Sequence, residues 1–332
     1  MQVSIKDTAP VIDRLESTYK ARVVDGEFGK CVEIRIDYPF ETIKEFSTNM
    51  DRTKRGLYAK LQLIKGIGPV TENFLKKRRY TSIKDMVFSR RRSWRADAAK
   101  LIGWIETNQK QKLAELRQVN DFDLLYCFTP GELAFLDIET TGIQDPRIFL
   151  IAIGLIDRRT RLFTIYQLFA RDLTEEASVI EHTLSLLKNH GCIVSFNGKS
   201  FDIPVLAARV LYYFAERLEN YISHHVDLLH ESRRIMGLDR KVKLSVLEEG
   251  CLDLDREFDV PSGKIPKIYS RYCDTGHNEE ILDALNSSSR NNRRDFILQM
   301  AKVIHHNMID VRSLLYIMEI LLKRTKFKNN SK

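Results

Sequence analysis

The pattern of hydrophobic and polar residues predicts a mixed α/β domain over residues 131–325. Three apolar runs, "ELAFLDIE", "RIFLIAIGLID" and "RLFTIYQLFA", are separated only by "TTGIQDP" and "RRT", which is typical of consecutive strands. "TEEASVIEHTLSLLKNH" then has helical spacing, with Thr174 as its expected N-cap. A short strand, "CIVSF", a helix from about 200 to 218, and a last helix ending in "HNMIDVRSLLYIMEILLKR" follow. A meander of strands followed by alternating helices and strands indicates a mixed sheet flanked by helices.

The chain before residue 131 has a different organisation. Apolar and polar residues alternate in "KCVEIRIDYPF", so 1–50 is expected to be a β-containing N-terminal segment. Residues 51–117 have apolar positions at helical spacing around one compact turn signal, "GIGP", which predicts a small helical domain. We expect 118–130 to be a linker and 326–332 to be a basic tail.

Composition narrows the class of protein. With 43% hydrophobic and 30% charged residues the chain is typical of a globular protein, and no apolar run is long enough to cross a membrane. The N-terminal residues lack the apolar core of a signal peptide. The five cysteines are scattered without a CxxC pair, so we expect reduced thiols in a cytoplasmic protein.

The positive charge is concentrated in one part of the chain. The formal net charge is +8, and residues 51–117 hold 18 Lys and Arg against 6 Asp and Glu. This segment carries the whole basic excess, which favours a polyanion-binding module beside a near-neutral domain. A well-solvated helical surface would explain the charge equally well.

Two acids stand at the end of an apolar strand in "FLDIETTG". Asp137 and Glu139 are two residues apart, so their side chains share one face of the strand, with Cα atoms roughly 6–7 Å apart. Both could therefore reach the same one or two cations. The alternative is a strand end that emerges into solvent, with both acids hydrated.

Two further acids follow in separate helical stretches. Asp202 falls in the first turn of the helix after "VSFNGKSFD", where it could also simply complement the helix dipole. In "IHHNMID", Asp310 lies four residues after His306 and therefore on its face of the helix, whereas His305 points about 100° away. Four carboxylates from three elements suit a two-metal phosphodiester hydrolase, and hard oxygen ligands select Mg²⁺ or Mn²⁺. A neutral histidine near the attacking water could act as the general base.

Spacing argues against two competing site types. "GKS" after the short strand is not a P-loop, because Ile193 stands where that motif requires its first glycine. His224, His225 and His230 surround Asp227, but no cysteine pair or HxxxH spacing accompanies them, which argues against zinc.

"FLDIETTG", "FNGKSFD" and "HHNMID" resemble the three motifs of the DEDD exonuclease superfamily, whose fold is ribonuclease-H-like. More closely, residues 130–325 resemble the YprB-like ribonuclease-H-like family, through stretches such as "HHVDLLHESRRI" and "KLSVLEEG". The resemblance implies a 3′–5′ exonuclease that binds two metal ions through Asp137, Glu139, Asp202 and Asp310. It also implies that Thr140, Thr141 and Asn197 lie near the terminal nucleotide. The superfamily places a Tyr four residues, or a His five residues, before the last Asp; here those positions hold His306 and His305, and helix geometry favours His306.

The stretch "LIKGIGPVTENFLKKRRYTSIKDMV" resembles a helix-hairpin-helix motif. In that motif Gly66 and Gly68 would let backbone N–H groups approach a phosphate, and nearby cations would add non-specific attraction. The candidate nucleic-acid-binding residues are Lys65, Gly66, Gly68, Lys76, Lys77 and Arg78, and the core candidates are Leu61, Ile64, Val70, Phe74 and Leu75. A plain turn between two helices that needs glycine is the alternative.

Taken together, the sequence predicts a metal-dependent nuclease acting on DNA or RNA, with a 3′–5′ exonuclease as the leading hypothesis. A structure-specific endonuclease would use the same hairpin module. A non-catalytic nucleic-acid-binding protein is the third possibility, although all four acids and a candidate base are present.

Overall fold

The computed structural model describes residues 20–239, 242–254, 256, 260–276, 280–286 and 295–325. The chain divides into two compact units, and each is described by itself below. The first consists of residues 1–41 and 131–321, and the second of 42–130 and 322–332. The expected basic tail, 326–332, lies outside the described residues.

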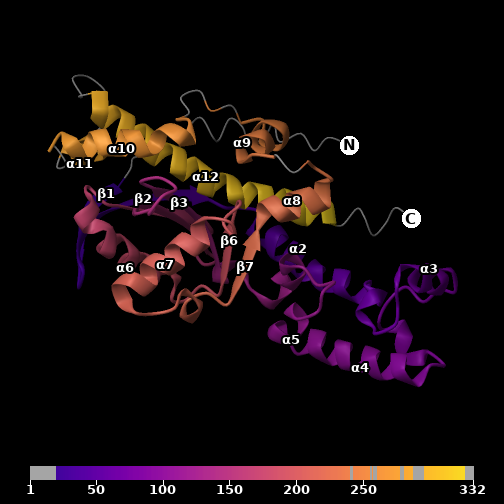
Figure 1. Ribbon diagram of the computed structural model, residues 1–332. Coiled ribbons are helices and arrows are strands. Elements are labelled where there is room, and N and C mark those ends of the chain that lie inside the picture. Colours follow the sequence, from indigo (N-terminus) through magenta and orange to yellow (C-terminus); the bar gives the residue numbers. More distant parts are fainter. Residues whose placement is uncertain are drawn as a thin grey trace. The chain divides into compact units, whose positions relative to one another are not determined.

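A seven-stranded mixed sheet forms the centre of the first unit (Figure 1). The strands lie in the order β1-β2-β5-β4-β3-β6-β7. Their bounds are β1 Lys20–Gly26, β2 Gly29–Pro39, β3 Leu133–Thr140, β4 Ile148–Asp157, β5 Leu162–Phe169, β6 Cys192–Ser195 and β7 His224–Asp227. Within β1-β2-β5-β4-β3, each pair of neighbouring strands is antiparallel. β6 runs parallel to β3, and β7 runs parallel to β6. The predicted mixed α/β fold is confirmed.

The strand predicted in "KCVEIRIDYPF" is an inner strand of this sheet. β2 pairs with β5 from Val32 opposite Phe169 to Pro39 opposite Leu162, and β1 covers its other edge. Residues 20–41 therefore belong to the sheet unit, although the sequence suggested a separate segment 1–50. Alternation identifies a strand but not its partner, and here the partner lies beyond the whole second unit.

Helices cover both faces of the sheet (Figure 1). One face carries α6 Glu176–Leu187 and α7 Asp202–Phe214, and the other carries α10 Ile265–Asp274, α11 Glu280–Asn286 and α12 Asp295–Thr325. This unit also contains α8 Leu228–Met236 and α9 Leu244–Leu247. Thr174 is not the N-cap of α6, because Asp172 caps the short 3₁₀ turn before it and accepts from the backbone N–H of Thr174.

The second unit is helical. It contains α2 Ile43–Tyr58, α3 Pro69–Lys77, α4 Arg92–Glu106, α5 Lys110–Ala114 and the 3₁₀ helices Leu61–Leu63, Asp85–Phe88 and Asp121–Cys127. The last of these lies in the segment expected to be a linker, and its Leu124 and Tyr126 are buried in the core of this unit. Of the expected core residues, Leu61, Ile64 and Leu75 are buried.

The other two expected core residues of the hairpin are exposed. Val70 is 83% exposed and Phe74 is 51% exposed. Both lie on the solvent face of α3, because the helix buries Leu75 and so turns its other apolar positions outward. Among the described residues no helix is both long and apolar enough to span a lipid bilayer.

Candidate active site

Asp137 and Glu139 lie on the same side of β3, as their spacing predicts. The neighbouring Leu136 and Ile138 point the other way and are buried in the core. Asp137 contacts α12, where Asn307 Nδ2 donates to its Oδ2 at 2.7 Å. The apolar positions of β3 therefore fix which face the two acids present, and that face is the one that α12 covers.

Asp202 begins α7 and connects that helix to β3. Its Oδ1 accepts a hydrogen bond from the backbone N–H of Ile138 at 3.3 Å. The approach depends on Gly198, because a Cβ there would lie 2.3 Å from Ser195 Oγ and 3.3 Å from Asp202 Oδ2. The glycine therefore permits the tight loop that brings the second acidic element against the first.

Asp310 and His306 occupy one face of α12. His306 Nε2 lies 3.5 Å from Asp310 Oδ2, and the histidine is buried. His305 is exposed on another side of the helix. The helical spacing thus brings His306, and not His305, to the acid.

The four acids form one electrostatically coupled cluster. Burial raises the pKa of Asp137 well above its ordinary value, and the charges of Asp310 and Glu139 raise it further. The pKa of Glu139 is raised in the same way by burial, then by Asp310 and Asp202. Burial is also the main cause that raises the pKa of Asp202 to about 6. Such an arrangement stabilises any cation that enters it.

Arg256 is an internal cation at this cluster. Its side chain is 8% exposed and pairs with Glu248, with Nε to Oε2 at 2.8 Å and Nη2 to Oε1 at 2.5 Å. Nη2 also donates to Asp310 Oδ1, and Nη1 lies 3.1 Å from His306 Nδ1. A guanidinium only donates, so this contact makes Nδ1 of His306 the acceptor and leaves the ring proton on Nε2, which faces Asp310.

Sequence reasoning missed a buried amide pair that supports Asp137. Gln167 Nε2, from β5, donates to Asn307 Oδ1 at 2.9 Å and to the carbonyl of Ile304 at 2.7 Å. Asn307 is thereby oriented with its own N–H₂ group toward Asp137. The available signal was Gln167 itself, the single amide in the largely apolar run "RLFTIYQLFA". Arg256 and Glu248 carried no comparable local signal.

Asp227 holds the loop that carries Asn197. Its carboxylate accepts from the backbone N–H groups of Asn197 at 2.8 Å, Lys199 at 3.1 Å and Leu229 at 3.0 Å. Asn197 is exposed, with φ at +65°, a conformation that asparagine tolerates better than most residues. Asp227 therefore determines where the candidate nucleotide contact lies.

The remaining candidates of this unit have local structural partners. Thr140 Oγ1 donates to the carbonyl of Gly142 at 3.0 Å, and Thr141 Oγ1 accepts from the backbone of Arg147 at 3.1 Å. Among the histidines set aside as zinc ligands, His225 Nε2 lies 2.8 Å from Ser195 Oγ, His230 Nε2 lies 3.9 Å from Asp227, and His224 is buried.

The donor set fits a divalent metal in its chemistry. Asp137, Glu139, Asp202 and Asp310 offer carboxylate oxygens, the ligands that Mg²⁺ and Mn²⁺ prefer. The charge of Asp310 contributes to the raised pKa of Asp137 and of Glu139. Within the described ranges, no three His, Cys, Asp or Glu side chains are arranged as a ready-made metal site. Arg256 donates to Asp310 Oδ1, so an ion that uses this oxygen requires the guanidinium to reorient, whereas Asn307 occupies only Oδ2 of Asp137.

A cavity of about 390 Å³ opens beside the acids. Asp137 and Asp310 form part of its wall, together with Phe196, Arg233 and Lys243. The volume is within the range of small-ligand sites, and the two cations would attract an anionic group.

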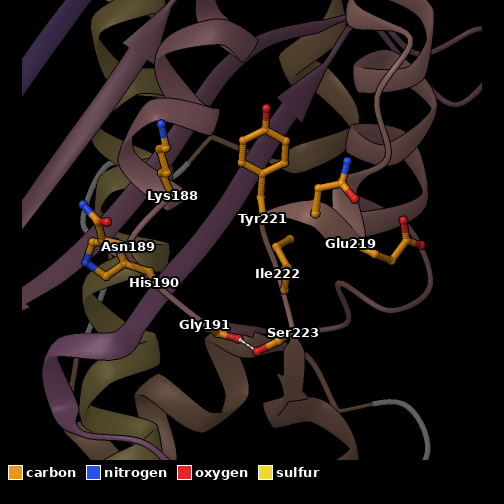
Figure 2. Close-up of a pocket in the computed structure, with 9 residues that line it drawn as sticks. Lys188, Asn189, His190, Gly191, Glu219, Tyr221, Ile222 and Ser223 are labelled. Carbon is orange, nitrogen blue, oxygen red and sulfur yellow. Dashed lines mark hydrogen bonds between the residues drawn. The ribbon is translucent and has the colours of Figure 1, made fainter.

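A second cavity, of about 260 Å³, lies at the amino ends of β6 and β7 (Figure 2). Its walls are the loops that precede the two strands, where Ser223 Oγ donates to the carbonyl of Gly191 at 2.8 Å. Glu219 is the one carboxylate among its lining residues. This cavity therefore cannot gather several acids around an ion, and the catalytic candidates lie at the other end of these strands.

In the second unit, the hairpin candidates surround the "GIGP" turn. Gly66 has φ at +83°, which favours glycine, and Gly68 precedes the first residue of α3. Lys65, Lys77 and Arg78 are exposed, and Lys76 pairs with Glu72 at 2.9 Å. The turn therefore favours glycine at position 66, and exposed cations lie around it.

Comparison with known proteins identifies the first unit. Residues 134–322 match the RNase H superfamily, a superfamily that typically hydrolyses phosphodiester bonds and generally uses divalent metal ions. No curated protein matches the chain. Since the match covers more than half of the chain, and the mixed sheet agrees with that fold, the protein belongs to the RNase H superfamily.

Proposed function

We propose that the chain is a metal-dependent nuclease of the DEDD type, which removes nucleotides from the 3′ end of a DNA or RNA strand. The observation that carries this proposal is the coupled cluster of Asp137, Glu139, Asp202 and Asp310, contributed by β3, α7 and α12. Carboxylates that are partly or fully buried and repel one another are costly, and a site for cations explains why they are together.

The four carboxylates would hold two Mg²⁺ or Mn²⁺ ions. When bound, such ions activate a water and stabilise the charge on the leaving 3′-oxygen. Asn307 orients Asp137, and Asp202 is held against β3 by the Ile138 backbone, so the protein positions both carboxylates in advance. Arg233 and Lys243, beside the acids, would attract the phosphate of the strand.

His306 is our candidate for the general base. It shares a face of α12 with Asp310, and it is buried, whereas His305 is exposed. In the arrangement described, its Nδ1 accepts from Arg256 and its Nε2 faces Asp310. Accepting a proton from water therefore requires Arg256 to withdraw from Nδ1.

The second unit would bind the nucleic-acid backbone without reading its sequence. The "GIGP" turn with Gly66 in the left-handed region and the lysines and arginines beside it supports this role. We further propose that the reaction takes place in the cytoplasm, as the scattered cysteines suggested.

The test uses the full chain with 5′-labelled single-stranded and duplex DNA and RNA, in Mg²⁺ or Mn²⁺. Products that shorten stepwise from the 3′ end, and that are absent with EDTA and in Asp137→Asn, would support the exonuclease. Asp137→Asn keeps the acceptor oxygen but removes the charge, so its melting temperature would show that the fold is intact.

Other product patterns would contradict the proposal. Internal cuts that depend on Asp137 would identify an endonuclease. Binding without cleavage on every substrate would identify a nucleic-acid-binding protein that lacks catalysis. Cleavage that persists in Asp137→Asn would place the chemistry outside this cluster.

A further inference from the structure

A second basic surface, beside the hairpin turn, exposes an aromatic ring. Phe88 is 80% exposed at the end of the 3₁₀ helix Asp85–Phe88. Residues 86–96 include four arginines and no acid. We name this surface the Phe88 patch and define it by Phe88, Arg90, Arg91, Arg92 and Trp94.

The loop that carries the patch is held in one conformation by its own contacts. Arg95 Nη1 donates to the carbonyl of Ser89 at 2.8 Å, and the buried Ser89 side chain accepts from the backbone N–H of Arg91 at 3.2 Å. Arg91 also lies over the Trp94 ring, 4.8 Å from its centroid. The exposed ring of Phe88 therefore stands next to a fixed loop, which lowers the entropic cost of binding.

The patch is next to the "GIGP" turn. A Cβ placed on Gly66 would lie 3.8 Å from Trp94 Nε1, so the patch and the turn meet at this tryptophan. Lys65, immediately before the turn, is exposed as well. A strand bound at one of these places would be within reach of the other.

We propose that the Phe88 patch binds single-stranded nucleic acid, with Phe88 stacking on an unpaired base and the arginines contacting the adjoining phosphates. A phosphate backbone alone would explain the cations but not the aromatic ring. Duplex bases are stacked on one another and offer the ring no free face, whereas the bases of a single strand do. The inference rests on the proposed function only in taking nucleic acid as the substrate.

Charge and position favour nucleic acid over an anionic membrane, which could also attract arginines and a phenylalanine. The patch adjoins a turn whose geometry suits a phosphate backbone, and the same chain carries a domain of the RNase H superfamily. Binding to lipid is therefore kept as an outcome of the test.

The experiment measures binding of the full chain in EDTA to a labelled single strand and to a duplex of the same length, by fluorescence anisotropy at several salt concentrations. Phe88→Ala should weaken single-strand binding about 5- to 150-fold, with duplex binding nearly unchanged. Its salt dependence should match that of the unaltered chain, because no charge is lost. Arg91→Gln should instead reduce the single-strand salt slope by about 0.7.

Tyr212→Ala is the matched control. Like Phe88, Tyr212 is an exposed aromatic residue, and Arg209 lies 4.7 Å from the centroid of its ring, but Tyr212 is on α7 in the other unit. Its removal should leave both affinities unchanged. Because Phe88 is exposed, thermal unfolding of Phe88→Ala should match that of the unaltered chain, so weaker binding would not reflect misfolding.

Three outcomes would overturn the inference. Phe88→Ala could bind the single strand as tightly as the unaltered chain, or could lose single-strand and duplex binding equally. The unaltered chain could also bind phosphatidylserine vesicles through Phe88 and not the oligonucleotide. If any of these results is found while 3′-end cleavage is intact, only the inference about Phe88 is refuted and the proposed function stands. If the unaltered chain neither binds nor cleaves nucleic acid, the inference and the proposed function are both refuted.

Discussion

Replacing Asp202 by asparagine should stabilise the metal-free protein while abolishing its activity. The pKa of Asp202 is about 6 in the folded chain against an ordinary 3.8, chiefly because it is buried. A raised pKa favours folding at pH values below 3.8, and this contribution is lost as the pH rises through 6. Above that pH the charged form costs about 3 kcal/mol, from a shift of about two units at 1.36 kcal/mol each.

The side chain introduced by Asp202→Asn would carry no charge, and its amide oxygen could still accept from the Ile138 backbone, as the Asp202 carboxylate does at 3.3 Å. The free energy of unfolding in EDTA should therefore rise by about 3 kcal/mol at pH 7.5 and by only about 1 kcal/mol at pH 4.5. For a unit of this size the gain at pH 7.5 corresponds to roughly 6–12 °C in Tm.

Calorimetry at both pH values is the assay, with Asp145→Asn as the control. Asp145 is exposed, and asparagine tolerates its φ of +46°, so that variant removes the same charge without relieving burial. The reasoning is refuted if Asp202→Asn lowers the stability at pH 7.5. It is equally refuted if the gain is the same at the two pH values, because the stabilisation would then not come from titration.

Two further predictions concern packing and the internal cation. Gly154→Ala should cost about 1–3 kcal/mol of unfolding free energy, since its Cβ would lie 2.2 Å from Phe163 Cζ and 2.8 Å from Val311 Cγ1; an unchanged denaturation midpoint would contradict this. Arg256→Gln should tighten Mn²⁺ binding in titration calorimetry by roughly tenfold, because it removes a positive charge from Asp310, and weaker binding would show that Arg256 supports the ion instead.

The parts of the fold that the sequence predicted are those determined by local pattern. Strand alternation and the apolar run of β3 set the common face of Asp137 and Glu139, and helical spacing set His306 beside Asp310. Each of these needs only residues within one element. The same reasoning was wrong for the helix α3, where Val70 was expected in the core. The apolar spacing there allows either of two helix faces to be buried, and the structure leaves Val70 exposed to solvent.

The parts that could not be predicted are contacts between distant residues. Arg256 joins His306 and Asp310 across a long separation in the chain, and an arginine in a polar stretch gives no sign of being buried. The pairing of Gln167 with Asn307 is of the same kind. Whether the cluster binds two metal ions remains a prediction for the assays above.

The pairing of β2 with β5 has a consequence for how the chain folds. β2 cannot pair with β5 until the ribosome has synthesised residues 42–130 and then β3, β4 and β5. Residues 42–130 have a core of their own. Residues 42–130 are in this sense an insertion within the sheet unit, and the pairing raises the contact order of the fold. A fragment beginning at residue 131 would retain every residue that matches the superfamily, yet it would leave β5 with an open edge. Unpaired N–H and C=O groups along such an edge recruit other chains, so residues 20–41 protect the RNase H superfamily domain from self-association.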